Sequence, residues 1–413
     1  MEQMEQNNQR NGYWSGLLSG LLLAILLIGS IYVGKQVFQI FEAKKIAENA
    51  QAEDAELMNE YTAAKVEVIE DTIKEYYLEE ADRNTLENGI YTGLVNSLED
   101  PYSVYYSAEE LEELQMSTEG IYYGIGAYLS KVATDEYCVI SGVIENTPAE
   151  EAGLRADDII YMVDGVDVYG MDITEVVALI KGEEGTQVVL TLVREGESDY
   201  LEIPVERRKI ESPTVSSEMM ENGIGYIQIT EFDDVTEDQF AESLAECKGN
   251  GMKALILDLR SNPGGNLSTV CEICRMLLPK GMIVYTEDKY GNRDEYTCDG
   301  LRQLKVPAVV LVNGYSASAS EILAGAMKDH GIATIMGTTT FGKGIVQRVI
   351  SLSDGSAVKL TVSKYYTPNG NDIHEKGIEP DVEVEYDADA YYNEGIDNQL
   401  QEAVKYLSEK VGN

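Results

Sequence analysis

The chain has 413 residues, of which 44% are hydrophobic and 25% are charged, a composition typical of globular domains that excludes wholesale disorder. Asp and Glu number 73 against 31 Lys and Arg, so the net charge at pH 7 is −42. A surface this acidic repels phosphate groups, which argues against nucleic acid as a partner and against docking onto anionic lipid. Two histidines are too few for most zinc hydrolase sites, and five cysteines in so long a chain do not predict a disulfide framework. We therefore expect no metal and no cofactor, and a length that allows two or three domains.

A short N-terminal tail (1–13) precedes a stretch without any charged residue (14–34). As a helix this stretch would be about 31 Å long, which matches the roughly 30 Å hydrocarbon core of a bilayer. No small-residue cleavage signal of the Ala-x-Ala kind follows it, so we predict a retained transmembrane signal anchor. More cations follow this stretch than precede it, which by the positive-inside rule would place the long following segment in the cytoplasm. This indication is weak, because the rule counts short loops and large domains cross regardless of charge.

Residues 35–115 have a helical and acidic pattern. Apolar residues recur every three to four positions between 66 and 77, which predicts an amphipathic helix with one buried stripe. Asp100-Pro101 interrupts two shorter helices, and Ser107 followed by Glu110 predicts a capping box. Heptads are not sustained, so pairing of this region with a second copy is only a possible mode of dimerisation.

Residues 116–207 show a glycine-rich turn, Gly124-Ile125-Gly126, that runs into a strand. Strands, a short Pro-Ala helix, an Asp-Gly turn, a helix and a final strand follow in the order that resembles a PDZ domain. Such a loop aims backbone N–H groups at a carboxylate, while the adjacent strand edge pairs with an extended chain. We expect this module to bind C-terminal tails with apolar last residues, and Lys181 or Arg155 are candidates for added positive charge.

Residues 208–385 alternate buried strands with helices, which predicts a layered α/β domain, and a helical segment (386–413) follows. Ser316, Ser318 and Ser320 lie in the predicted turn between a strand and the following helix. Helix N-termini offer unpaired N–H donors that stabilise an oxyanion, but serine is also simply a good helix cap. These physical arguments do not choose among the three serines.

Lys343 lies between two glycines, and Gln347 follows four positions later. A lysine acts as a base only when neutral, which requires a pKa lowered from about 10.4 to about 7–8 by burial. We expect Phe341, Ile345 and Val346 to shelter the amine. Gln347 shares its face of a strand and is expected to orient it.

Three segments together carry a specific resemblance: DLRSNPGG (258–265), SASASE (316–321) and FGKGIVQ (341–347), preceded by the PDZ-like module. They resemble the C-terminal processing peptidase family, as do LEDPYS (98–103) and GIEPDVEV (377–384). The resemblance implies a crotonase/ClpP-like α/β serine protease domain with an inserted PDZ domain.

The resemblance also implies residue roles. Ser318 would be the nucleophile, Lys343 the general base and Gln347 the residue that positions the lysine. The backbone N–H groups of Gly264 or Gly265 and of Ala319 would form the oxyanion hole. Tyr315 departs from the small residue that the family more often carries, which could narrow the cleft.

The sequence thus predicts a membrane-anchored serine endopeptidase that acts on proteins or peptides with free C-termini. The resemblance to the family implies that the catalytic domain lies outside the cytoplasm and that the chain forms a homodimer. One alternative is a catalytically inactive PDZ sensor or scaffold on the same fold, and another is a lyase or hydratase of related architecture. His330 and His374 are weaker candidates for a catalytic base. Cys271 and Cys274, at i and i+3 of one helix, are expected to be packing residues and not zinc ligands.

Overall fold

The computed structural model describes residues 56–131 and 136–412, which fall into two compact units divided between Ile90 and Tyr91. The predicted membrane span at 14–34 and the tail before it lie outside the described residues. None of the helices in the described ranges combines the length and the apolar character that crossing a bilayer requires.

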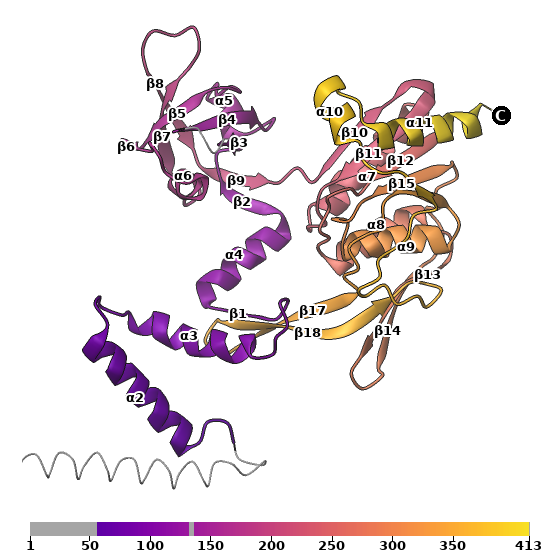
Figure 1. Cartoon of the computed structure of the whole chain (residues 1–413). Helices are drawn as coiled ribbons and strands as arrows, with labels where there is room; N and C mark the ends of the chain where they lie inside the picture. Colours follow the sequence, from indigo (N-terminus) through magenta and orange to yellow (C-terminus); the bar gives the residue numbers. More distant parts are fainter. Residues whose placement is uncertain (1–55, 132–135, 413) are drawn as a thin grey trace, which may run out of the picture. The chain divides into compact units, whose positions relative to one another are not determined.

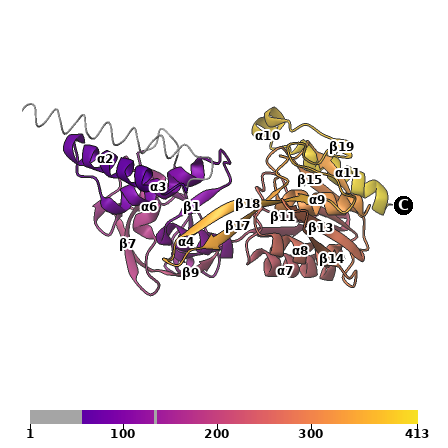
Figure 2. The ribbon, with the colours of Figure 1, turned by 90° about the horizontal axis from the view of Figure 1, so that it is seen from below.

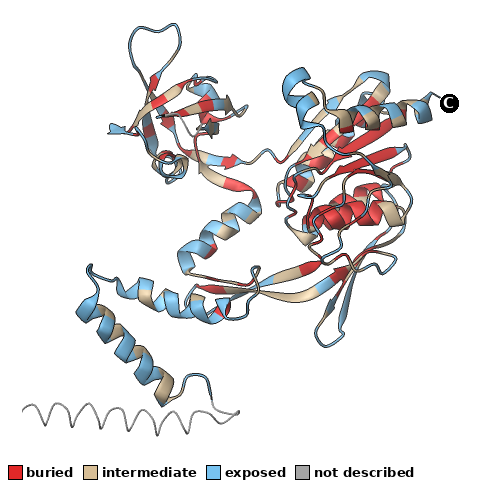
Figure 3. Cartoon of the chain, in the orientation of Figure 1, coloured by how far each residue is buried: buried red, intermediate tan, exposed pale blue. Residues whose placement is uncertain are grey.

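The N-terminal part of the described chain is helical, as predicted. It forms α2 (Glu60–Tyr76), α3 (Arg83–Asn96) and α4 (Ala108–Glu119). The predicted capping box is present, because the Ser107 hydroxyl accepts from the backbone N–H of Glu110, whose carboxylate accepts from the N–H of Ser107. The predicted buried stripe of α2 is wrong for this structure, since no residue of α2 is buried (Figure 3).

A short strand, β1 (Val104–Tyr106), interrupts the region that the sequence predicted to be helical. It pairs antiparallel with β18 (Ala357–Tyr366), so that Val104 lies opposite Lys359. The buried ring of Tyr105 lies between two half-buried neighbours, which is the alternation of a strand with one covered face. This strand brings the 100–106 segment to a sheet of the α/β domain.

The predicted PDZ-like module consists of two small β-sheets, a short helix and one longer helix (Figure 1). Its principal sheet has the order β3-β4-β5-β7-β8, with β6 paired to β5, and a separate pair joins β2 to β9. The element bounds are β2 (Ile121–Gly124), β3 (Ala127–Ser130), β4 (Cys138–Val143), α5 (Pro148–Glu151), β5 (Ile159–Val163), β6 (Val166–Asp167), α6 (Ile173–Ile180), β7 (Gln187–Val193), β8 (Leu201–Glu206) and β9 (Arg208–Glu211). Alternate residues of β7 are buried in an apolar core of their own, as expected for a sheet covered on one face.

The layered α/β domain that the sequence predicted is centred on a six-stranded sheet of order β10-β11-β12-β15-β16-β19. All neighbours in it are parallel except β10 and β11. The elements are β10 (Val215–Met219), η1 (Glu221–Gly223), β11 (Ile224–Ile229), α7 (Thr236–Gly249), β12 (Ala254–Asp258), α8 (Leu267–Leu277), β15 (Ala308–Val312), α9 (Ala319–Asp329), β16 (Ala333–Gly337), β19 (Val382–Glu383), α10 (Ala388–Glu394) and α11 (Asn398–Val411).

Both faces of this sheet are covered. One apolar core includes residues of α7, α8 and α9, and a second, smaller core lies under α11. Every residue of β12 and β15 is buried, which explains their unbroken apolar sequences (Figure 3). The carboxyl ends of these two strands carry the loops that contain the predicted site residues, as is usual in open α/β sheets.

A second sheet completes the domain, with the order β1-β18-β13-β14 and β17 paired to β18. Its remaining elements are β13 (Gly281–Asp288), β14 (Arg293–Cys298) and β17 (Ile345–Ser351). Strands β17 and β18 form a long hairpin (Figure 2), and the loop that carries Lys343 leads directly into β17.

Candidate active site

Ser318 is the N-cap of α9 and has an unusual backbone conformation, with φ 55° and ψ −112°. A non-glycine residue at positive φ is strained and persists only where its surroundings hold it. The Tyr365 hydroxyl donates to the Ser318 carbonyl at 2.9 Å, and the Glu321 carboxylate accepts from the Ser318 N–H at 2.9 Å. The turn therefore has a fixed shape at the start of the helix.

The three serines that the sequence could not rank differ in their surroundings. The Ser316 hydroxyl donates to the Leu259 carbonyl at 2.8 Å, and the Ser320 hydroxyl donates to the Asn262 carbonyl at 3.0 Å. Both side chains are fully buried, whereas Ser318 is half-buried. Ser316 and Ser320 thus tie the turn to the 259–262 loop, and Ser318 is the one with access to solvent.

The glycine loop after β12 lies against Ser318. A Cβ atom at Gly264 would lie 2.7 Å from the Cβ of Ser318 and 3.0 Å from the amide nitrogen of Ala319, so only glycine fits this approach. The Gly264 N–H donates to the Asn262 side chain at 2.8 Å. The N–H groups of Gly265 and Ala319, in contrast, have no acceptor among the described residues. Two of the three predicted oxyanion donors are therefore available to a substrate.

Glu321 is a central residue of the site that the sequence analysis missed. It is fully buried, and its carboxylate accepts from the backbone N–H groups of Ser318 (2.9 Å), Gly342 (2.7 Å) and Lys343 (2.8 Å). The Thr340 hydroxyl donates to the same carboxylate at 2.6 Å. The Ser-x-x-Glu spacing of a capping box at 318–321 was the available signal. One carboxylate thus joins the serine turn to the loop that carries the lysine.

The Lys343 amine lies over the ring of Tyr102, at 4.5 Å from the ring centroid, a contact that the sequence analysis did not predict. Phe341 is 54% exposed and Ile345 is buried, and the shelter of the amine by Phe341, Ile345 and Val346 stays a prediction. Burial, together with the charge of Lys359, lowers the pKa of Lys343, while Glu321 and Asp100 act in the opposite direction. No hydrogen bond joins the Lys343 amine to the Ser318 hydroxyl in the described structure.

Gln347 does not contact the Lys343 amine through a hydrogen bond in the described residues. Its amide donates to the Thr361 hydroxyl at 3.3 Å. In the pairing of β17 with β18, Gln347 lies opposite Thr361, after a register shift between Val346 and Gln347. The structure therefore brings Gln347 to the neighbouring strand, and its predicted role in orienting the lysine stays a prediction.

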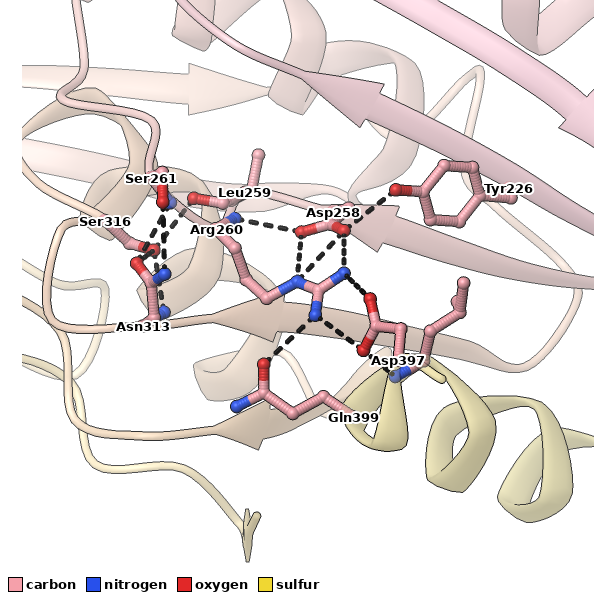
Figure 4. A network of polar contacts seen from close by, with 10 residues as sticks. Tyr226, Asp258, Leu259, Arg260, Ser261, Asn313, Ser316, Asp397 and Gln399 are labelled. Atoms are coloured by element: carbon pink, nitrogen blue, oxygen red, sulfur yellow. Dashed lines mark hydrogen bonds and ion pairs between the residues drawn. The ribbon is translucent and has the colours of Figure 1, made fainter. Parts of the chain in front are cut away.

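A polar network fixes the start of the glycine loop (Figure 4). Arg260 pairs with the fully buried Asp258 at 2.6 Å and with Asp397, at the start of α11, at 2.8 Å. The hydroxyl of Tyr226 donates to Asp258 at 2.9 Å, and Gln399 accepts from Arg260 at 3.0 Å. Because Arg260 contacts Asp258, Asp397 and Gln399, these contacts fix the conformation of the chain where the glycine loop begins after β12.

The predicted tail-binding loop of the PDZ-like module lines a cavity of about 130 Å³. Gly124, Ile125 and Gly126 form one side of the cavity, and most of its other lining residues are apolar. The N–H groups of Ile125 and Gly126 have no acceptor in the described residues. Of the two candidate cations, Lys181 lines the cavity and Arg155 does not.

The weaker candidates lie elsewhere. The His330 ring contacts the Met282 carbonyl at 2.7 Å at the end of α9, and neither histidine forms a hydrogen bond with Ser318 in the described residues. Cys271 and Cys274 are buried packing residues, and burial raises the pKa of Cys271 to about 12. Tyr315, the departure noted above, is 74% exposed. The described ranges contain no group of three residues able to hold a metal ion.

Comparisons with known proteins identify the family of this chain. Peptidase family S41 matches residues 223–384, a PDZ domain matches 139–194, and the N-terminal domain of the activating protease CtpB matches 24–110. The chain is 38% identical over 333 residues to carboxy-terminal processing protease CtpA of Bacillus subtilis (strain 168), covering 78% of this chain and 71% of that protein. It is 33% identical over 374 residues to CtpB of the same organism, with 88% and 77% covered. It is 36% identical over 320 residues to a carboxyl-terminal-processing protease of Synechocystis, with 76% and 74% covered.

Proposed function

Since this chain belongs to the carboxy-terminal processing proteases of peptidase family S41, and is therefore a serine peptidase, we propose that Ser318 is its nucleophile and Lys343 its general base. The observation that carries the proposal is the shared anchoring of the two loops on Glu321, which accepts from the backbone N–H groups of both residues. It makes the position of the lysine loop depend on that of the serine turn.

The proposed reaction uses a neutral Lys343 amine to take the hydroxyl proton of Ser318 as its oxygen attacks the scissile carbonyl. The negative charge of the tetrahedral intermediate develops beside the free N–H groups of Gly265, in the glycine loop after β12, and of Ala319, the first residue of α9. The protonated lysine then donates to the leaving amine, and water releases the acyl group from the serine. Gln347 would orient the lysine once substrate has drawn the amine toward Ser318.

A serine-reactive phosphonate probe tests the nucleophile. We expect one covalent adduct, which peptide mapping places on Ser318, and no adduct on Ser316 or Ser320, whose hydroxyls are buried and donate to carbonyl groups. Chelators should leave labelling unchanged. An enzyme that hydrolyses peptides while its adduct lies on another residue would contradict the assignment, and a chain that neither labels nor hydrolyses would favour the inactive sensor or scaffold.

The PDZ module is proposed to bind the free C-terminus of the substrate in its 130 Å³ cavity. The free N–H groups of Ile125 and Gly126 suit a terminal carboxylate, and the apolar lining suits an apolar last side chain. Ile180→Asp would place a charge in the lining. We expect it to weaken binding of a peptide that ends in leucine by about tenfold or more in fluorescence anisotropy.

The matched control for this substitution is Val189→Asp, on an exposed face of β7. Val189→Asp should leave tail binding unchanged. A C-terminally amidated peptide should bind poorly both to the wild type and to Val189→Asp. Equal affinity of wild type and Ile180→Asp for the free-carboxylate peptide would contradict the proposed pocket.

We also propose that residues 14–34 attach the chain to a membrane and that the catalytic domain lies outside the cytoplasm. The chain is further proposed to form a homodimer, and its α/β domain to be crotonase/ClpP-like. These proposals rest on the uncharged N-terminal stretch and on the family resemblance. An anchored chain stays with membranes at alkaline pH and needs detergent for release, so full release without detergent would contradict the anchor.

A further inference from the structure

The segment 100–106 lies outside the catalytic set, yet it touches the lysine. It comes from the turn before β1, and β1 is held to the α/β domain by its pairing with β18. The Ser103 hydroxyl accepts from the Thr361 N–H at 3.2 Å, which fixes the turn on the same strand. The half-buried ring of Tyr102 presents its face to the Lys343 amine, 4.5 Å from the ring centroid.

The geometry points to Tyr102 as a positioning residue for Lys343, whose ring holds the ammonium form of the lysine in a resting position from which it must leave to act on Ser318. This inference rests on the proposed Ser318–Lys343 chemistry. The π-face of an aromatic ring attracts a cation but not a neutral amine, so the contact favours the protonated form. Tyr102 thereby opposes the deprotonation that catalysis requires.

The neighbouring charged groups act in both directions. Asp100, in the same turn, and Glu321, at the start of α9, favour the ammonium form, whereas burial and Lys359, on β18, disfavour it. Asp100 is itself held in place, since its carboxylate accepts from the Ser103 hydroxyl at 2.6 Å and from the Tyr102 N–H at 3.0 Å. The Lys359 amine donates to the Tyr106 hydroxyl at 2.8 Å, so the opposing charge is also fixed by the 100–106 segment.

Fluorination provides a test that keeps the size of the ring. Phe at position 102 retains the π-face, and 3,4,5-trifluorophenylalanine removes most of its attraction for a cation. The acid limb of the pH profile of kcat/KM reports the titration of the free enzyme, here that of Lys343. We expect the trifluorinated residue to move the acid limb about half a pH unit lower than in Tyr102→Phe, raising turnover below the midpoint about threefold.

Lys359→Gln should move the acid limb of the kcat/KM profile in the opposite direction. It removes a positive charge that disfavours the ammonium form, so the acid limb should move to higher pH. The role of Tyr102 would be overturned if the acid limb lay at the same pH in Tyr102→Phe and in the trifluorinated protein. A shift of the acid limb to higher pH on fluorination would also overturn it.

Lys343→Ala separates this inference from the function on which it rests. If Lys343→Ala retains turnover, the proposed dyad fails. If Lys343→Ala is inactive but fluorination leaves the acid limb in place, the dyad stands and the role of Tyr102 is overturned. Circular dichroism and thermal unfolding of each variant show whether the change in activity occurs in a folded protein.

Discussion

Replacing Lys343 by methionine is expected to reduce peptide hydrolysis by about 10³-fold or more, and Ser318→Ala is expected to do the same. Without the amine no group in the site takes the proton of the Ser318 hydroxyl, and without the hydroxyl there is no nucleophile. The two losses should not add in the double variant, because both residues act in one step. Steady-state hydrolysis of a fluorogenic peptide with an apolar free C-terminus measures both.

Folding is expected to survive both substitutions. Methionine fills the space of the lysine side chain, and the backbone N–H groups of residues 318 and 343 still donate to Glu321. Lys364→Met, on the exposed part of the neighbouring strand β18, is the matched control and should keep wild-type turnover. Turnover of Lys343→Met within tenfold of wild type would contradict the proposed base.

The direction of the pH dependence follows from the same assignment. Burial lowers the pKa of Lys343 from its usual value near 10.5, so the neutral amine becomes available at lower pH than for an exposed lysine. Activity should rise as pH increases through this pKa, because deprotonation creates the base. Activity that falls over the same range, in a protein that stays folded, would contradict this sign.

The order of elements could be read from the sequence because local patterns encode it. The unbroken apolar runs of β12 and β15 and the glycines at 264 and 265 predict buried strands and a close loop, and the structure contains them. The resemblance to the family singled out Ser318 where physical reasoning left three serines, and the structure shows that the other two hydroxyls are occupied by carbonyl groups.

What the sequence did not predict depends on contacts between distant segments. Tyr102 reaches Lys343 only because β1 adds to β18, and no local pattern near either residue encodes that pairing. The register shift that pairs Gln347 with Thr361 of β18 is likewise not encoded by the local alternation of β17. Helix α2 has the apolar spacing of a buried helix, but periodicity does not specify the surface that would cover it.

Glu321→Gln is expected to lower both stability and turnover, although it changes one oxygen to an amide group. The carboxylate accepts four hydrogen bonds with its two oxygens, from three backbone N–H groups and the Thr340 hydroxyl. A glutamine keeps one acceptor oxygen and turns an N–H₂ group toward donors that have no other acceptor nearby. Leaving such buried donors unpaired costs about 1–3 kcal/mol each, so we expect the free energy of unfolding to fall by about 3 kcal/mol.

Turnover should fall by about 10²-fold or more at a temperature where the variant is still folded, because the serine turn and the lysine loop lose their common anchor. Urea unfolding measures the first effect and single-turnover hydrolysis the second. Thr340→Val is the matched control, since it removes one bond to the carboxylate and spares the three backbone N–H bonds. It also removes the acceptor of the Ile378 N–H. A smaller loss of turnover in Thr340→Val than in Glu321→Gln would show that the effect comes from the backbone contacts. Wild-type stability and turnover in Glu321→Gln would show that the two loops hold their positions without the Glu321 carboxylate.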